Sequence, residues 1–236
     1  MKRITSIIIM VVALALTSCG PRSGRDAASA QNDSTATATM EKKMIEEPEF
    51  DIVTSKGTMR IKLYSMTPKH RDNFVKLVNE KYYDGVRFHR VIEGFMIQTG
   101  DPYSRDTAKV NLWGQGGPDY TVPAEFVNQY WHKKGAIAAA RKGDLANPKK
   151  ASSGSQFYIV HNENVCRQLD GDYTVFGEVT EGLEVIDAIA DVATDRYDRP
   201  YEDVIIITIN RIGLPVQEPA AEADTTSTSS DSTSVE

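Results

Sequence analysis

The sequence has little cysteine, with Cys19 and Cys166 the two cysteines in 236 residues. This excludes a disulfide-rich scaffold and any four-cysteine zinc site. The four histidines are scattered, without an H-E-x-x-H motif, so no metal site is expected. Basic residues number 27 against 33 acidic ones, and the net charge of −6 argues against nucleic acid as the main partner. No apolar run reaches the roughly 20 residues that a membrane-spanning helix needs.

Motifs for covalent catalysis and for phosphate binding are also missing. The sequence Gly154-Ser155-Gln156 lacks the second glycine of a nucleophile elbow, so serine hydrolase chemistry has no support. Residues 114–117 are rich in glycine, but Pro118 follows them and no Lys-Ser/Thr pair is present. A tight turn is therefore favoured there over a phosphate-binding loop.

The first residues have the pattern of a secretory signal. Lys2 and Arg3 precede an uncharged apolar run over 4–16, which is too short to span a membrane. The ending L-T-S-C resembles a bacterial lipobox, in which cleavage precedes a cysteine that is then lipidated. Residues 1–18 are predicted to be a lipoprotein signal peptide, with lipidation at Cys19; a plain signal with an incidental cysteine is the alternative. The expected location is the bacterial cell envelope, with the lipid in the outer membrane facing the periplasm.

Two further segments have compositions that cannot supply a packed core. Residues 19–47 contain no aromatic residue and are rich in Ala, Ser and Thr, which predicts a flexible tether after the lipidated cysteine. Residues 215–236 are acidic and rich in Ser and Thr without a basic residue, which predicts a disordered tail. The remaining residues, 48–214, are predicted to form one domain.

Patterns within that domain predict many short strands and two helices. Met59, Ile61 and Leu63 alternate with polar residues, as in a half-buried strand, and Thr67-Pro68 marks the start of a helix. The predicted helices are 68 to about 82–85 and 183–190, and the further strands are 86–92, 95–99, 136–140, 156–161, 173–179 and 204–209. Such a pattern favours an antiparallel sheet closed into a barrel, with one helix over each open end.

The most distinctive stretch is 88–101, where two strand-like pieces meet at a Glu-Gly turn. Arg90 lies two residues after Phe88, and Gln98 lies two residues after Met96. Even spacing along a strand places side chains on one face. The result is a surface that combines a guanidinium, an amide, a phenyl ring and a thioether. A half-polar strand pair, with Arg90 in an ordinary salt bridge, fits the same pattern.

Four blocks of the sequence resemble the signature blocks of the cyclophilin family, in the family's order. They are F-H-R-V-I-E-G-F-M-I-Q-T-G-D (88–101), G-G-P-D-Y-T-V-P-A-E-F (116–126), G-S-Q-F-Y-I (154–159) and L-D-G-D-Y-T-V-F-G (169–177). The resemblance covers essentially all of 50–214. It implies a mainly β fold, a closed eight-stranded antiparallel β-barrel capped by two α-helices. It also implies peptidyl-prolyl cis–trans isomerase activity on proline-containing polypeptides.

By the same resemblance, Arg90 and Gln98 are the catalytic residues. Arg90 would donate to the prolyl nitrogen, and Gln98 would bind the substrate backbone. The further substrate-binding positions are Phe95, Met96, Ala140, Arg141, Phe157, Tyr158, Leu169 and Tyr173. Of these, Phe95, Met96, Tyr158 and Leu169 would form an apolar socket for the proline ring, here called the proline socket. Rotation about an X–Pro bond makes and breaks no covalent bond, so no cofactor or metal is expected.

Several positions depart from the family pattern. Arg141 stands where asparagine is common, and Tyr173 where histidine is frequent. Tyr158 replaces the more usual phenylalanine, and its added hydroxyl needs a partner or water. Gln168 stands where many relatives carry an aromatic residue that contacts cyclosporin, so weak cyclosporin binding is predicted. His89 is predicted to be structural rather than catalytic.

The sequence therefore predicts a lipid-anchored isomerase that acts as a monomer on unfolded or extended envelope proteins. A non-catalytic peptide-binding or holdase module is the alternative, and the presence of both Arg90 and Gln98 favours the enzyme. With Cys19 lipidated, Cys166 would be unpaired. It is predicted to be a partly buried small residue rather than a reactive thiol.

Overall fold

Alternating apolar residues form the first hairpin of the domain. In the computed structural model, which describes residues 46–213, β1 (Glu49–Thr54) pairs antiparallel with β2 (Gly57–Leu63). Phe50 and Ile52 of β1 lie opposite Ile61 and Met59 of β2, and all four side chains are fully buried. The predicted strand at 59–63 is confirmed, and β1 was not predicted. The predicted signal peptide, Cys19, nearly all of the tether and the tail lie outside the described residues.

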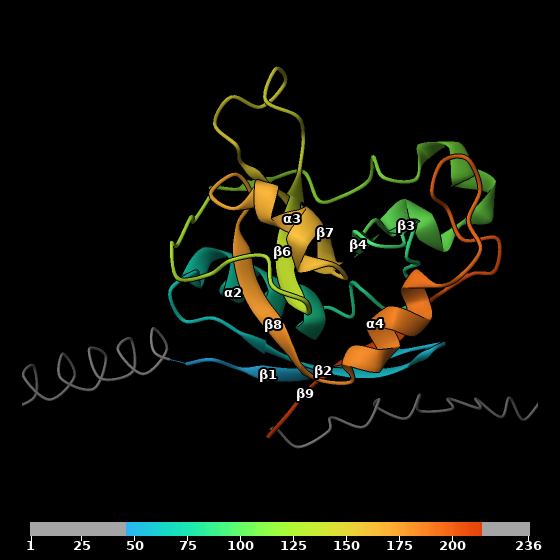
Figure 1. Ribbon diagram of the computed structural model, residues 1–236, viewed down its shortest axis with the longest axis horizontal. Coiled ribbons are helices and arrows are strands. Elements are labelled where there is room, and N and C mark those ends of the chain that lie inside the picture. The colour runs from blue at the N-terminus through green and yellow to red at the C-terminus, as the bar shows by residue number, and fades with distance from the viewer. Residues whose placement is uncertain (1–45, 214–236) are drawn as a thin grey trace, which may run out of the picture. The chain divides into compact units, whose positions relative to one another are not determined.

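Eight strands follow one antiparallel path in the order β3-β4-β7-β6-β8-β2-β1-β9, and β5 pairs with β7 beside this path. The remaining strands are β3 (Arg90–Ile92), β4 (Met96–Thr99), β5 (Thr121–Val122), β6 (Ala136–Arg141), β7 (Ser152–Val160), β8 (Val175–Glu181) and β9 (Ile206–Arg211). Figure 1 shows β1, β2 and β9 in one layer, from which β8 leads across to β6 and β7. The mainly β antiparallel architecture is as predicted.

The sheet is an open half-barrel, so the predicted closure of eight strands into a complete barrel is wrong. The end strands β3 and β9 do not pair with each other within residues 46–213, and the sheet path stops at each of them. The chain just before β3 meets the chain just before β9 through an isolated bridge between Arg87 and Ile205, a few backbone hydrogen bonds and the ion pair of Arg87 with Asp203 at 2.8 Å. A regular strand was predicted over 86–92, but the strand begins only at Arg90. A three-residue end strand is too short to close the sheet.

Helices cover parts of the sheet, and each is short. α2 (Pro68–Asn79) begins at the predicted proline and ends a few residues earlier than expected, whereas α4 (Leu183–Ala190) has the predicted bounds. Elements that were not predicted are α3 (Glu163–Cys166) and the 3-10 helices η1 (Pro102–Arg105), η2 (Thr107–Leu112) and η3 (Arg167–Leu169). Among residues 46–213, none of the helices has the length and hydropathy of a membrane span.

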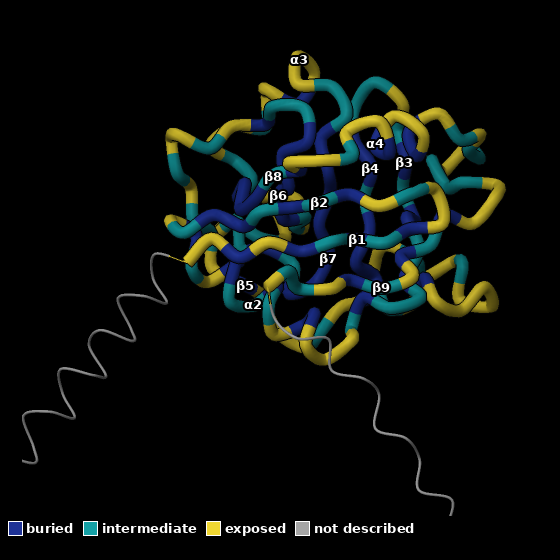
Figure 2. Tube along the Cα trace, turned by 90° about the horizontal axis from the view of Figure 1, so that it is seen from below, coloured by how far each residue is buried: buried dark blue, intermediate teal, exposed yellow. Residues whose placement is uncertain are grey.

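Aromatic side chains from α2 and the strands form the centre of the core. The ring of Phe74 on α2 lies 5.7 Å from that of Phe50, 5.2 Å from Tyr83, 5.6 Å from Phe157 and 6.0 Å from Phe176, measured between centroids. Such aromatic pairs add about 0.5–1.5 kcal/mol each beyond the area they bury. Figure 2 shows the buried residues along the strands and the exposed ones mostly in the connecting loops. A rigid sheet therefore supports the loops around it.

Candidate active site

Four adjacent strands place side chains in one row across the sheet. Arg90 on β3 lies opposite Gln98 on β4, Gln98 lies opposite Tyr158 on β7, and Tyr158 lies opposite Ala138 on β6. Residues that face each other across strands have Cβ atoms about 4.5–5.5 Å apart. Even spacing in the sequence predicts which residues of one strand share a face. The register between strands then brings Arg90, Gln98 and Tyr158 together.

Arg90, Gln98 and Tyr158 line a groove with a cavity volume of about 130 Å³. The groove is lined by Arg90, Phe95, Met96, Gln98, Ala140, Arg141, Tyr158, Leu169 and Tyr173. All nine were predicted as catalytic or substrate-binding residues. The groove thus combines a mainly apolar wall with a guanidinium and an amide at one side, as a ligand site requires.

Phe157 is the one predicted binding residue that does not line this groove. Successive residues of a strand point to opposite faces, so Phe157 and Tyr158 on β7 cannot both face the groove. Phe157 is 1% exposed and packs edge-on against Phe74 and Tyr83 in the core. Its assignment as a substrate-binding residue is therefore corrected to a core residue.

Gln156 holds the amide of Gln98, a role that the sequence analysis missed. Its Nε2 donates to the carbonyl oxygens of Gly114 at 3.1 Å and Gly116 at 2.7 Å. Because a carbonyl can only accept, the other end of the Gln156 amide must be the oxygen, and it accepts from Gln98 Nε2 at 3.1 Å. The carbonyl oxygen of Gln98 is then directed away from Gln156. The sequence did contain a signal for this role, because Gln156 lies two residues before Tyr158 and therefore on the same face of β7 as Tyr158.

His89 packs behind Gln98. Its Nε2 lies 3.3 Å from Gln98 Nε2, and the residue is 4% exposed. Burial lowers the pKa of His89 to about 4, despite the opposing effect of the Asp101 carboxylate. The imidazole is therefore neutral at neutral pH and can accept from the Gln98 amide. A buried, neutral ring behind the groove fits the predicted structural role.

A distant segment places a carboxylate beside Arg90. Arg90 Nε lies 3.4 Å from Asp198 Oδ2, and the two side chains are 43% and 42% exposed. Asp198 adopts a left-handed backbone conformation, with φ of 62°, and its carbonyl accepts from the Val91 amide at 2.7 Å. Arg90 therefore both forms an ordinary salt bridge and lines the groove, which the sequence analysis had treated as alternatives.

At the other side of the groove, Arg141 is held by the neighbouring loops. Its guanidinium lies 4.4 Å from the centroid of the Tyr173 ring, and its Nε donates to the Asp172 carbonyl at 2.8 Å. It also pairs with Asp144 at 2.5 Å in the loop between β6 and β7, which projects from the sheet in Figure 1. Lys150 pairs with the carboxylate of Asp172 and lowers its pKa. Arg141 therefore shapes the groove wall and anchors this loop.

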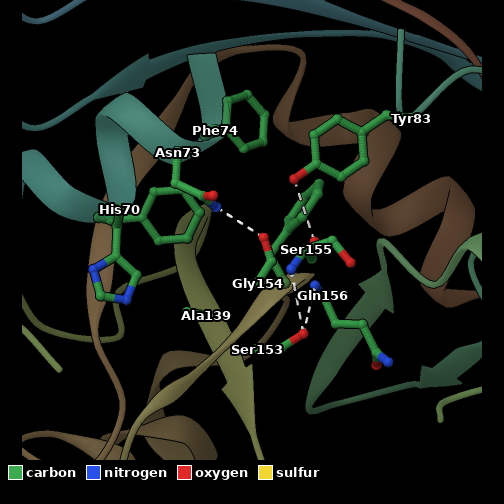
Figure 3. Close-up of a pocket in the computed structure, with 11 residues that line it drawn as sticks. His70, Asn73, Phe74, Tyr83, Ala139, Ser153, Gly154, Ser155 and Gln156 are labelled. Atoms are coloured by element: carbon green, nitrogen blue, oxygen red, sulfur yellow. Dashed lines mark hydrogen bonds between the residues drawn. The ribbon is translucent and has the colours of Figure 1, made fainter. Parts of the chain in front are cut away.

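A second, smaller hollow lies between α2 and β7, with a cavity volume of about 20 Å³ (Figure 3). Asn73 Nδ2 donates to the Gly154 carbonyl at 2.8 Å, and the Tyr83 hydroxyl donates to the Ser155 carbonyl at 3.3 Å. The Ser153 hydroxyl accepts from the amides of Ser155 and Gln156 at 3.3 and 3.1 Å. These bonds hold the irregular part of β7 from which Gln156 reaches Gln98. The hollow is thus part of the scaffold behind the groove.

His70, which lines this hollow, lies between the hydroxyl of Ser152 and the carboxylate of Glu125. His70 Nε2 lies 2.9 Å from Ser152 Oγ, and His70 Nδ1 lies 2.7 Å from Glu125 Oε2. A hydrolytic triad needs an exposed nucleophile beside an oxyanion-binding site. Ser152 is 1% exposed and His70 is 4% exposed, so no substrate carbonyl reaches the hydroxyl. These three residues tie α2 to β7 and to the chain near Glu125.

Cys166 is fully buried, beyond the partial burial that was predicted. Its Sγ donates to the Phe95 carbonyl at 3.2 Å. Burial raises the pKa of the thiol to about 12, so the reactive thiolate is scarce at neutral pH. Cys166 therefore acts as a core residue beneath the groove.

The family model for cyclophilin type peptidyl-prolyl cis-trans isomerase/CLD matches residues 49–211. The chain belongs to the cyclophilin family. Peptidyl-prolyl cis-trans isomerase-like 3 of Gallus gallus is 37% identical over 162 residues, which cover 66% of this chain and 92% of that protein. Peptidyl-prolyl cis-trans isomerase cyp15 of Rhizopus delemar is 33% identical over 181 residues, or 76% of this chain. Those residues span 27% of the Rhizopus protein, so this cyclophilin matches about a quarter of that relative.

Solved structures agree with this assignment. The crystal structure of a cyclophilin type isomerase from Cryptosporidium parvum matches with a TM-score of 0.63 and 28% identity, over 72% of this chain and all of that one. A second structure of the same protein, in the presence of the dipeptide Ala-Pro, matches with a TM-score of 0.60. The match confirms the cyclophilin-like, mainly β fold.

Proposed function

We propose that this cyclophilin accelerates cis–trans rotation about X–Pro bonds in unfolded or extended proteins. The observation that carries the proposal is the row of Arg90, Gln98 and Tyr158 along one groove, beside an apolar wall that fits a proline ring. The structure of a relative in the presence of Ala-Pro supports a proline-containing ligand for this groove. Assistance to protein folding is consistent with the family.

The proposed chemistry needs only differential binding. Amide resonance sets a rotation barrier of about 18–20 kcal/mol, and an enzyme lowers it by binding the twisted amide more tightly than either planar form. Arg90 donates to the prolyl nitrogen as that nitrogen becomes pyramidal and its lone pair leaves conjugation with the carbonyl, and the planar guanidinium holds its donors in a fixed direction. The Gln98 carbonyl oxygen, turned away from Gln156, accepts from the substrate backbone. The proline socket holds the ring while the preceding residue rotates.

A proline-peptide assay tests this function. The purified protein, mixed with a peptide that contains an Ala-Pro bond, is expected to increase the cis–trans exchange rate measured by NMR or by a protease-coupled readout. Binding of the peptide without any acceleration over the uncatalysed rate would favour the non-catalytic holdase and contradict the proposed isomerase.

Asp198→Asn is expected to lower kcat/KM roughly two- to fivefold. The ion pair of Arg90 with Asp198 is partly exposed, and such pairs contribute about 0.2–1 kcal/mol. Here the pair is expected to act by orienting the Arg90 guanidinium. Asparagine keeps the backbone bond to Val91, so the loop stays attached to β3. Glu93→Gln is the control, because it removes the same charge from the exposed β3–β4 turn. Equal activities of the two variants would show that Asp198 does not orient Arg90.

The protein is further proposed to be a lipid-anchored envelope protein, supported by the apolar run over 4–16 and the L-T-S-C ending. Cys19→Ala is expected to move the protein from the membrane fraction to the soluble fraction of cells that express it, because the acyl chains are then absent. Ser18→Ala keeps a small residue before the cysteine and should leave the membrane fraction unchanged. A membrane-bound Cys19→Ala variant would contradict the anchor.

A further inference from the structure

A chain of three hydrogen-bonded side chains lies beneath the proline socket. The hydroxyl of Tyr158 is 2.8 Å from Nε2 of His132, and Nδ1 of His132 is 2.6 Å from Oδ1 of Asp170. The same carboxylate oxygen accepts from the backbone amide of His132 at 2.9 Å. Tyr158 comes from β7, His132 precedes β6, and Asp170 follows η3. The chain therefore joins three separate parts of the groove wall.

The positions of the protons follow from these partners. A carboxylate only accepts, so Nδ1 of His132 carries the hydrogen that it shares with Asp170. Burial lowers the pKa of His132, although Asp170 opposes this effect, and the ring is neutral at neutral pH. The lone pair of Nε2 then accepts the O–H of Tyr158. The hydroxyl hydrogen points at His132 and away from the groove.

Burial limits the Tyr158 hydroxyl to one hydrogen-bonding partner. The side chain of His132 is 0% exposed and Tyr158 is 4% exposed, so bulk water does not compete for the hydrogen bond between them. In residues 46–213, His132 is the one hydrogen-bonding partner of the Tyr158 hydroxyl. A buried polar network of this kind is stable only while each member is satisfied. Removal of His132 would leave the hydroxyl to find another acceptor.

We propose that His132 and Asp170 are positioning residues that turn the Tyr158 hydroxyl away from the groove, so that a proline ring meets only the aromatic face. The inference rests on the proposed isomerase function, since it concerns how the same socket receives proline. Without an acceptor at 132, the hydroxyl would bond water in the socket, and proline would have to displace that water at a loss of affinity. The effect falls on substrate binding, while Arg90 and Gln98 act on the rotating bond.

Asp170 has a second connection to the groove. It directly follows Leu169, which lines the socket, and its bond to the backbone amide of His132 fastens that wall. This backbone bond persists when the imidazole is replaced. A substitution at 132 therefore tests the ring itself, with the wall still attached.

The test compares His132→Leu with and without the Tyr158 hydroxyl. In the otherwise unchanged protein, His132→Leu is expected to raise KM, and the Kd of a proline peptide from titration, about tenfold with kcat within about twofold. In a Tyr158→Phe background, the same substitution is expected to raise KM less than twofold, because no hydroxyl is left to reorient. An equal rise in both backgrounds, or a loss confined to kcat, would overturn the proposal.

NMR of the unsubstituted protein provides a measurement that does not depend on the folding of a variant. We expect His132 as the neutral ring protonated at Nδ1, with a slowly exchanging hydroxyl proton on Tyr158. A ring protonated at Nε2, or at both nitrogens, at neutral pH would overturn the proposal. If the unsubstituted protein showed no isomerase activity, the proposed function would fail, and peptide affinity and the tautomer would still decide the role of His132.

Discussion

Arg90→Ala is expected to lower kcat/KM for prolyl isomerisation by about two to three orders of magnitude, with the fold intact. Loss of one preorganised donor to a developing charge costs about that much in other enzymes. Arg90 lies on a short end strand, and its side chain is 43% exposed, so little packing is lost with it. Exchange rates on a proline peptide, measured by NMR with circular dichroism as the check on folding, give the result.

Two further variants sharpen this test. Arg90→Lys keeps the charge but lacks the planar fork of donors, so it should recover only part of the activity. Arg60→Ala is the matched control, because Arg60 also lies on a strand and pairs with a carboxylate, Asp51, at 3.0 Å, yet does not line the groove. Full activity in Arg90→Ala, or an equal loss in Arg60→Ala, would refute the role assigned to Arg90.

Gly100→Ala is expected to destabilise the domain by about 2–5 kcal/mol and to reduce activity as well. Gly100 has φ of 92°, and a Cβ there would lie 2.3 Å from the Ser155 carbonyl oxygen and 2.8 Å from the Gln156 Cα. A left-handed conformation costs a residue with a side chain about 1–2 kcal/mol, and overpacking adds about 1–3 kcal/mol. Because β7 must move at Gln156, the hydrogen bond that orients Gln98 is also weakened. Urea unfolding and the exchange assay measure the two effects.

Gly94→Ala separates the contribution of packing from that of the backbone. Gly94 also has a positive φ, of 73°, but a Cβ there would meet nothing within 4 Å. Only the backbone cost of about 1–2 kcal/mol then applies. If the two alanine variants were equally stable, the close approach of Gly100 to β7 would not be a determinant of stability.

Local sequence patterns correctly predicted several elements of the fold and most of the groove residues. The helix at 183–190 was predicted with its observed bounds, because apolar residues at helical spacing bury one face against the sheet. The strand at 59–63 followed from alternation, and nine predicted site residues line one groove. Phe157 was predicted to line the groove because it belongs to the same motif as Tyr158. Adjacent residues of a strand point to opposite faces, so Phe157 lies in the core instead.

Contacts between distant residues explain what was missed. Asp198 meets Arg90 across 108 positions, and Gln156 meets Gln98 across 58. His132 and Asp170 were also not assigned roles, although the sequence showed that the Tyr158 hydroxyl needs a partner. No periodicity within a segment indicates which distant loop will supply such a partner. The open sheet was not predicted for the same reason, because closure depends on whether the distant strands β3 and β9 pair.

The sequence by itself determined the local elements, the shared face of Arg90 and Gln98, and the family to which the domain belongs, because each depends on short-range spacing or on blocks in order. Only the tertiary structure decided the register across β3, β4, β7 and β6, the orientation of the Gln98 amide, and the partners of Arg90 and Tyr158. Those features depend on which distant groups are brought within hydrogen-bonding distance. The physical reason is that a strand defines its two faces from its own residues, whereas its neighbours are set by the packing of the whole chain.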